Sequence, residues 1–271
     1  MRRALAGCFA LSVAAPPLGV FLVLRRMSLM SDVLQHGVLP GIAVGAAVGG
    51  LSVWAMGTGG MLAGLAVALL AGWFARRTGM GEDSQLAGLY LVALAAGVAL
   101  ISAQRGIDLT HLLFGSVLAV DNTALLAMAG AATLTLPVLA VIWRPMVLES
   151  LDPGLPGGAI SASGNGGIWH SGFLALVVLC VVSGFEALGT LMSVGLMMLP
   201  AIAARHWSGS LAGQVSVAVA LAIAASVLGL LISFNVEIPA GPAIVLTAGA
   251  FWVVSLLVGP HQGLLWAGRG L

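Results

Sequence analysis

The sequence predicts an all-α polytopic membrane protein with about eight transmembrane helices in one bundle. Of its 271 residues, 60% are hydrophobic and only 7% are charged, whereas a soluble globular domain has about 25% charged residues. Apolar runs long enough to cross a bilayer, about 20 residues each, follow one another along the chain. Because a helix satisfies its backbone polar groups without water, each run is predicted to be helical.

The apolar runs differ in length. The first continues into Arg25 and is too long for the core of a signal peptide, so we expect it to be retained as a helix. The sixth is too long for one simple span, and we expect it to break or bend near Glu186, Gly189 and Gly195. Each of the others has the length of one span. The predicted spans are Ala4–Leu24, Val38–Met56, Thr58–Ala75, Gln85–Ala103, Leu118–Trp143, Gly172–Ala204, Leu211–Phe234 and Gly241–Val258.

Small residues recur every four positions in the second and third runs. Residues at this spacing lie on one face of a helix, and small side chains there let two backbones approach closely. Tight helix packing is therefore the expected role of both series. They are Gly37, Gly41, Gly45 and Gly49 in the second run, and Gly60, Gly64, Ala68 and Gly72 in the third.

Composition also limits the domain organisation and the function. Nothing indicates a second domain, so residues 1–271 are predicted to form a single transmembrane domain. The longest segment between spans, about residues 149–171, is rich in Gly, Pro and Ser. Lysine is absent, which excludes a P-loop and therefore an ATPase within this chain. A net charge of +1 without a basic run gives no electrostatic basis for binding nucleic acid.

The segment Met27–Gly41 places Asp32 and His36 four residues apart. On a helix these positions share a face, so both side chains can reach one cation. Imidazole together with carboxylate suits zinc, manganese or iron. A structural zinc site has four ligands, whereas two ligands suit a transport path that the ion must also leave. Pro40 clashes with the helical carbonyl of His36, so we expect a distorted helix beside the histidine.

Further candidates are weaker. Glu186 lies within an apolar run, where a carboxylate is a functional candidate by default. His111 lies three residues after Asp108, and the two residues would share a helix face or cap the turn that follows. Glu186 and His111 are accordingly secondary metal candidates. No permanently bound cofactor is expected.

Four segments together resemble the membrane permease subunits of ABC importers for zinc, manganese or iron, over nearly the full length of the chain. The family commonly has Gly and Ser where this chain has Ser31 and Gln35, and Gln35 adds an amide that can ligate a cation. The segments are RRMSLMSDVLQHGVLPG (Arg25–Gly41), DLTHLLFGSVLAV (Asp108–Val120), ALGTLMSVGLMMLPAIAAR (Ala187–Arg205) and IPAGPAIVL (Ile238–Leu246).

The resemblance implies a function, a set of partners and a location. The chain would be the permease subunit of an ATP-driven importer of a divalent transition metal, with zinc as the first expectation and Asp32 and His36 lining the metal path. It would work as a homodimer in the bacterial inner membrane, with a cytoplasmic ATP-binding subunit and a periplasmic or lipoprotein metal-binding protein. The segment at about residues 149–171 would be the cytoplasmic loop that docks on the ATPase.

Two other functions are alternatives to an ATP-driven importer. The first is a proton-coupled secondary metal transporter in which Glu186 relays the proton. The second is an intramembrane enzyme such as a metalloprotease, but the sequence contains neither an HExxH helix nor a GxSxG elbow.

Overall fold

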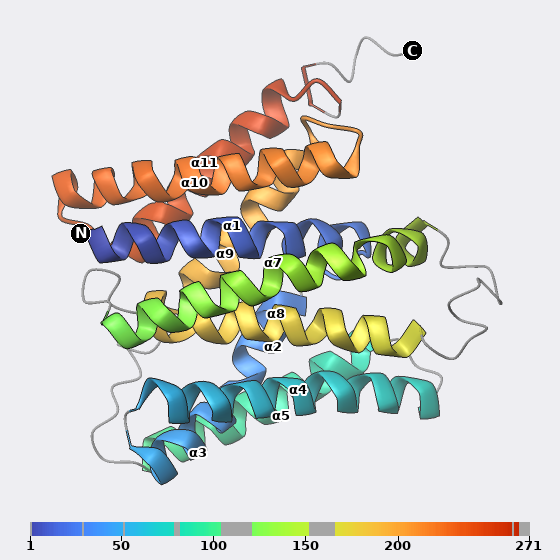
Figure 1. Cartoon of the computed structure of the whole chain (residues 1–271), viewed down its shortest axis with the longest axis vertical. Helices are drawn as coiled ribbons and strands as arrows, with labels where there is room; N and C mark the ends of the chain where they lie inside the picture. Colours follow the sequence, from blue (N-terminus) through green and yellow to red (C-terminus); the bar gives the residue numbers. More distant parts are fainter. Residues whose placement is uncertain are drawn as a thin grey trace. The chain divides into compact units, whose positions relative to one another are not determined.

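The computed structural model describes residues 2–28, 30–50, 52–78, 82–103, 121–151, 166–261 and 263–265. Every regular element within these ranges is an α-helix, as the sequence predicts. The helices are α1 (Arg2–Leu24), α2 (Met30–Gly37), α3 (Leu39–Gly49), α4 (Val53–Thr78), α5 (Glu82–Ala103), α7 (Asn122–Leu151), α8 (Gly166–Leu188), α9 (Thr190–Arg205), α10 (Leu211–Val236) and α11 (Ala240–Val258) (Figure 1).

Six of the described helices are long and apolar enough to cross a membrane, namely α1, α4, α5, α7, α10 and α11. Two shorter apolar stretches, Trp169–Phe185 in α8 and Thr190–Arg205 in α9, bring the set to the predicted number of about eight. The polytopic all-α class is therefore confirmed. Two of the predicted spans are nevertheless interrupted by helix breaks in the structure.

The predicted span Val38–Met56 is wrong. Here α2 ends at Gly37, α3 ends at Gly49 after 11 residues, and α4 begins at Val53. A helix rises 1.5 Å per residue, so α3 is about 16 Å long and cannot cross the bilayer alone. Gly50 causes the second break, because its φ of 69° lies in the left-handed region that favours glycine.

The predicted distortion beside His36 is confirmed. Val38 separates α2 from α3, and Pro40 lies in the first turn of α3. Proline has no backbone N–H, and this position in a helix needs none from it. Pro40 therefore both interrupts the helix after His36 and fits the first turn of α3.

The long run Gly172–Ala204 breaks at one of its three predicted positions. Gly189, with a φ of 85°, separates α8 from α9. Glu186 and Gly195 lie inside helices, so a break at either of them is not observed. A Cβ added to Gly195 would lie 2.7 Å from the Cγ2 of Val245 on α11, so this glycine allows close packing of α9 against α11.

The chain divides into two units. One contains residues 29–108 and 133–182, and the other contains residues 1–28, 109–132 and 183–271. The helices α7 and α8 each run from one unit into the other. The single domain over residues 1–271 stays a prediction.

In the unit of residues 29–108 and 133–182, α3 packs against α4 through backbone atoms. A Cβ on Gly41 would collide with the carbonyl oxygen of Gly59, and a Cβ on Gly45 would collide with that of Ala55. Gly41 thus lies opposite Gly59, and Gly45 lies opposite Ala55. Because the number rises on α3 as it falls on α4, the two helices are antiparallel. The close packing expected from the glycine spacing is confirmed here, although Gly37 belongs to α2.

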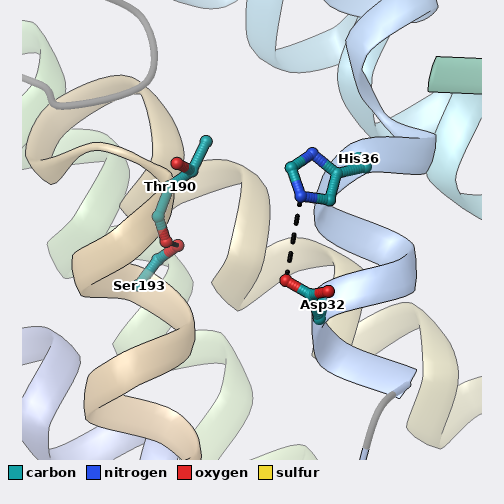
Figure 2. A network of polar contacts seen from close by, with 4 residues as sticks. All are labelled: Asp32, His36, Thr190 and Ser193. Carbon is teal, nitrogen blue, oxygen red and sulfur yellow. Dashed lines mark hydrogen bonds and ion pairs between the residues drawn. The ribbon is translucent and has the colours of Figure 1, made fainter. Parts of the chain in front are cut away.

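In the other unit, α1, α9, α10 and α11 pack together. A Cβ on Gly19 of α1 would collide with the carbonyl oxygen of Met197 on α9. Buried hydroxyl groups join α1 to α10, because the Oγ atoms of Ser12 and Ser226 lie 2.8 Å apart. On the first turn of α9, Ser193 Oγ donates to the carbonyl oxygen of Thr190 at 3.0 Å (Figure 2).

The segment predicted at about residues 149–171 is shortened at both ends. The helix α7 extends to Leu151 and α8 begins at Gly166. The remainder, residues 152–165, lies outside the described residues. Its proposed docking on an ATPase stays a prediction.

The α3–α4 contact can be tested with matched alanine substitutions. We expect Gly41→Ala to destabilise the protein by about 1–3 kcal/mol, because the new methyl group forces the two backbones apart. Gly88 on α5 is the control, since a Cβ there meets nothing within 4 Å. Gly88→Ala should be neutral or stabilise by about 0.5–1 kcal/mol. Thermal unfolding in detergent measures both, and equal melting temperatures for the two variants would contradict the close contact.

Candidate metal path

The eight residues of α2 hold the two main candidates in a fixed relation. Asp32 lies in the first turn of α2 and His36 in the last. A carboxylate is favoured near a helix N-terminus and an imidazole near a C-terminus, so both side chains suit their positions. Figure 2 shows them on one side of the helix, joined by their contact. The i, i+4 prediction is therefore confirmed.

The Asp32–His36 separation suits two ligands of a single ion. His36 Nε2 lies 3.8 Å from Asp32 Oδ1, which is too long for a hydrogen bond. Two donor atoms bound to one zinc-like ion at about 2.1 Å each are at most about 4.2 Å apart. The side chain of Asp32 is 56% exposed and that of His36 is 24% exposed. The carboxylate is therefore the more accessible of the two side chains.

The imidazole of His36 is held from the side by α5. The rings of His36 and Tyr90 have their centroids 5.8 Å apart and are tilted by 42°. Further along α5, a Cβ on Gly97 would lie 2.7 Å from Leu39 Cβ and 3.0 Å from Pro40 N. The absence of a side chain at Gly97 lets α5 approach the break between α2 and α3. Tyr90 and Gly97 were not recognised from the sequence, because neither has a metal-binding side chain.

Two more polar side chains of α2 face inward. Ser31 is 0% exposed and Gln35 is 3% exposed. Ser31 Oγ, Gln35 Oε1 and His36 Nδ1 are buried without a hydrogen-bond partner among the described residues. The sequence singled out Ser31 and Gln35 as departures from the family pattern, and Gln35 also as an amide that can ligate a cation. Their burial is a property of the fold.

The other candidates do not join Asp32 and His36 in the part of the chain that is described. His111 and Asp108 lie outside the described residues, and so does the side chain of Glu186, whose backbone belongs to α8. Within the described ranges, no group of three or more His, Cys, Asp or Glu side chains could hold a metal ion. The roles of Glu186 and His111 stay predictions.

Comparison with protein families identifies the chain. The model of the ABC 3 transport family matches residues 1–259. The chain belongs to the ABC 3 transport family. The resemblance stated from the four sequence segments is thereby confirmed.

Relatives of this ABC 3 chain include transport proteins for two metals. The manganese import system permease protein ScaB of Streptococcus parasanguinis is 32% identical over 263 residues, covering 97% of this chain and 91% of the relative. The manganese transport system membrane protein MntC of Halalkalibacterium halodurans is 27% identical and covers 99% of this chain and 91% of its own. The chelated iron transport system membrane protein YfeD of Yersinia pestis is 30% identical, with coverages of 95% and 84%.

A solved structure agrees with this ABC 3 assignment. PsaBC from Streptococcus pneumoniae in complex with Fab has a TM-score of 0.83 and 29% identity, covering 96% of this chain and 92% of the solved one. The ABC 3 chain is thus a multi-pass permease subunit, and the ATPase of such an importer is a separate chain.

Chemical modification of His36 tests the cation site without transport. We expect divalent manganese or zinc to slow the reaction of His36 with diethyl pyrocarbonate, because a bound ion occupies the reactive nitrogen. In Asp32→Ala this protection should be largely lost. Mass spectrometry of the modified peptides measures the rate at each histidine. His261, which is exposed, is the internal control, and equal protection of both histidines would contradict a site at His36.

Proposed function

We propose that this permease moves a divalent transition metal inward across the bacterial inner membrane, with manganese as the first candidate, past Asp32 and His36. The observation that carries the proposal is the 3.8 Å separation of a carboxylate and an imidazole on one face of α2. Such a nitrogen and oxygen pair suits manganese, iron and zinc. An ion held by two protein ligands keeps water in its other positions and can leave again.

The choice of manganese departs from the sequence expectation of zinc. Asp32 and His36 alone accept either metal. Two of the relatives named above are manganese import or transport proteins and the third is an iron transport protein. These names support manganese first and iron second for this chain.

Partner proteins follow from what this chain lacks. Its sequence has no lysine and therefore no P-loop, so hydrolysis of ATP requires a cytoplasmic ATP-binding subunit. Delivery of the ion requires a periplasmic or lipoprotein metal-binding protein. A second copy of the permease would complete the assembly as a homodimer in membrane lipid, with no nucleic acid involved.

The proton-coupled alternative, with Glu186 as relay, is less well supported. Membership of the ABC 3 transport family favours an ATP-driven mechanism. An ATP-driven importer and a proton-coupled transporter differ in the energy source that each requires.

Substitution of either candidate ligand should abolish transport. We expect Asp32→Ala and His36→Ala each to lower manganese uptake at least about tenfold, because each removes one of two protein ligands. Uptake is measured in cells that carry the whole importer, per molecule of permease inserted in the membrane. Asp121→Ala and His261→Ala are the controls and should retain uptake, since both residues are exposed and lie outside α2. Normal growth of Asp32→Ala under manganese starvation would remove this pair from the path.

The energy source can be tested in reconstituted vesicles that contain the whole importer. We expect uptake of manganese to require ATP together with the binding protein, since the permease has no motor of its own. A proton gradient without nucleotide should give no uptake. Uptake driven by the gradient alone would favour the secondary transporter instead.

A further inference from the structure

The inward-facing polar side chains of α2 form a continuous arc with the candidate ligands. Successive residues of a helix are about 100° apart, which orders the side chains as Ser31, Gln35, Asp32 and His36 over about 140° of the helix surface. Gln35 is three residues from Asp32 and four from Ser31, so it neighbours both. Gln35 therefore occupies the position next to Asp32 on the surface of α2.

Unpartnered buried polar atoms are concentrated on this arc. In the described ranges, four buried side-chain nitrogen or oxygen atoms have no hydrogen-bond partner, and three of them belong to Ser31, Gln35 and His36. The fourth is Nδ1 of His206. An unpaired polar atom in a dry site destabilises the fold, so a concentration of them needs an explanation such as an ion or water.

Apart from Nδ1 of His206, the other buried polar side chains in the described part of the chain have hydrogen-bond partners. Thr247 donates to the carbonyl oxygen of Ala243 at 2.7 Å. Gln214, the other buried glutamine among the described residues, donates from Nε2 to the carbonyl oxygen of Ser208 at 3.0 Å. The sequence is thus able to pair a buried amide on α10. The lack of a partner for Gln35 is specific to α2.

We propose that Gln35 supplies its amide oxygen as a third protein ligand to the passing ion, beside Asp32 and His36, and that Ser31 offers a second neutral oxygen next to it. The proposal rests on the proposed metal path and goes further by assigning a residue that sets metal preference. Carbonyl and carboxylate oxygens suit manganese, whereas imidazole suits zinc, copper and iron. The two neutral oxygens, added to the Asp32–His36 pair, therefore shift the metal preference of the site toward manganese.

A structural role and a ligand role for Gln35 predict opposite effects on stability. If the amide only supported the fold, its replacement by an apolar side chain of similar size would lower the melting temperature. If its oxygen is a ligand, the ion-free protein contains a buried polar atom without a hydrogen bond. Gln35→Leu removes the free-energy cost of that atom. We therefore expect Gln35→Leu to melt at the same or a higher temperature without metal while binding manganese more weakly.

The experiment uses the whole importer in lipid nanodiscs, without nucleotide and without the metal-binding protein. Binding of manganese is titrated by electron paramagnetic resonance, and zinc is then added as competitor. We expect Gln35→Leu to weaken manganese binding about tenfold, with a smaller effect on zinc. Gln35→Glu, which keeps an oxygen at the same distance from the backbone, should retain manganese binding.

Gln214→Leu is the matched control. It should lower the melting temperature, because it removes a buried hydrogen bond, and leave manganese binding unchanged. Unchanged manganese binding in Gln35→Leu, equal binding in Gln35→Leu and Gln35→Glu, or a Gln35→Leu importer that fails to assemble would each overturn the proposal. Asp32→Ala distinguishes failure of the metal path from failure of the Gln35 proposal. If Asp32→Ala also binds manganese normally, the metal path itself is wrong. If Asp32→Ala binds manganese weakly but Gln35→Leu binds it normally, only the ligand role of Gln35 is wrong.

Discussion

Inside a bilayer no water is available to pair with backbone polar groups, and the arrangement of each unit depends on this constraint. Helices satisfy it internally, and they then associate through close packing because lipid removes the hydrophobic drive. In this chain α3 and α4 pack closely, because Gly41 and Gly45 face backbone carbonyl groups directly. That contact fixes α3, and Pro40 at its start fixes where α2 ends beside His36.

The Asp32–His36 pair lies where helices are interrupted. The eight residues of α2 are bounded by Val38 and Pro40 at one end, and they carry the Asp32–His36 pair together with Ser31 and Gln35. The long uninterrupted helices α10 and α11 also carry polar side chains, but the hydroxyl groups of Ser233 and Thr247, for example, donate to nearby backbone carbonyl groups. Among the residues that the structure describes, buried polar atoms without hydrogen-bond partners thus lie mainly on α2.

Composition and local spacing predicted much of this structure. The apolar runs identified most of the helices, because length and hydropathy are local properties of the chain. The Asp32–His36 pair was predictable for the same reason, since positions i and i+4 meet on any helix. Gly50 was not recognised as the end of α3, since an apolar run does not reveal which of its many glycines adopts a positive φ. Tyr90 and the burial of Gln35 depend on which helix packs beside α2, and that is a property of the whole fold.

The glycine contact between α3 and α4 also bears on how such chains diverge. A contact made by backbone atoms requires only that the facing positions stay small, and it does not depend on the shapes of particular apolar side chains. Substitutions among Val, Leu, Ile and Ala elsewhere on these helices leave it intact. The solved PsaBC chain keeps a TM-score of 0.83 to this one at only 29% identity. A packing rule that restricts size at a few positions can be inherited through such extensive change in sequence.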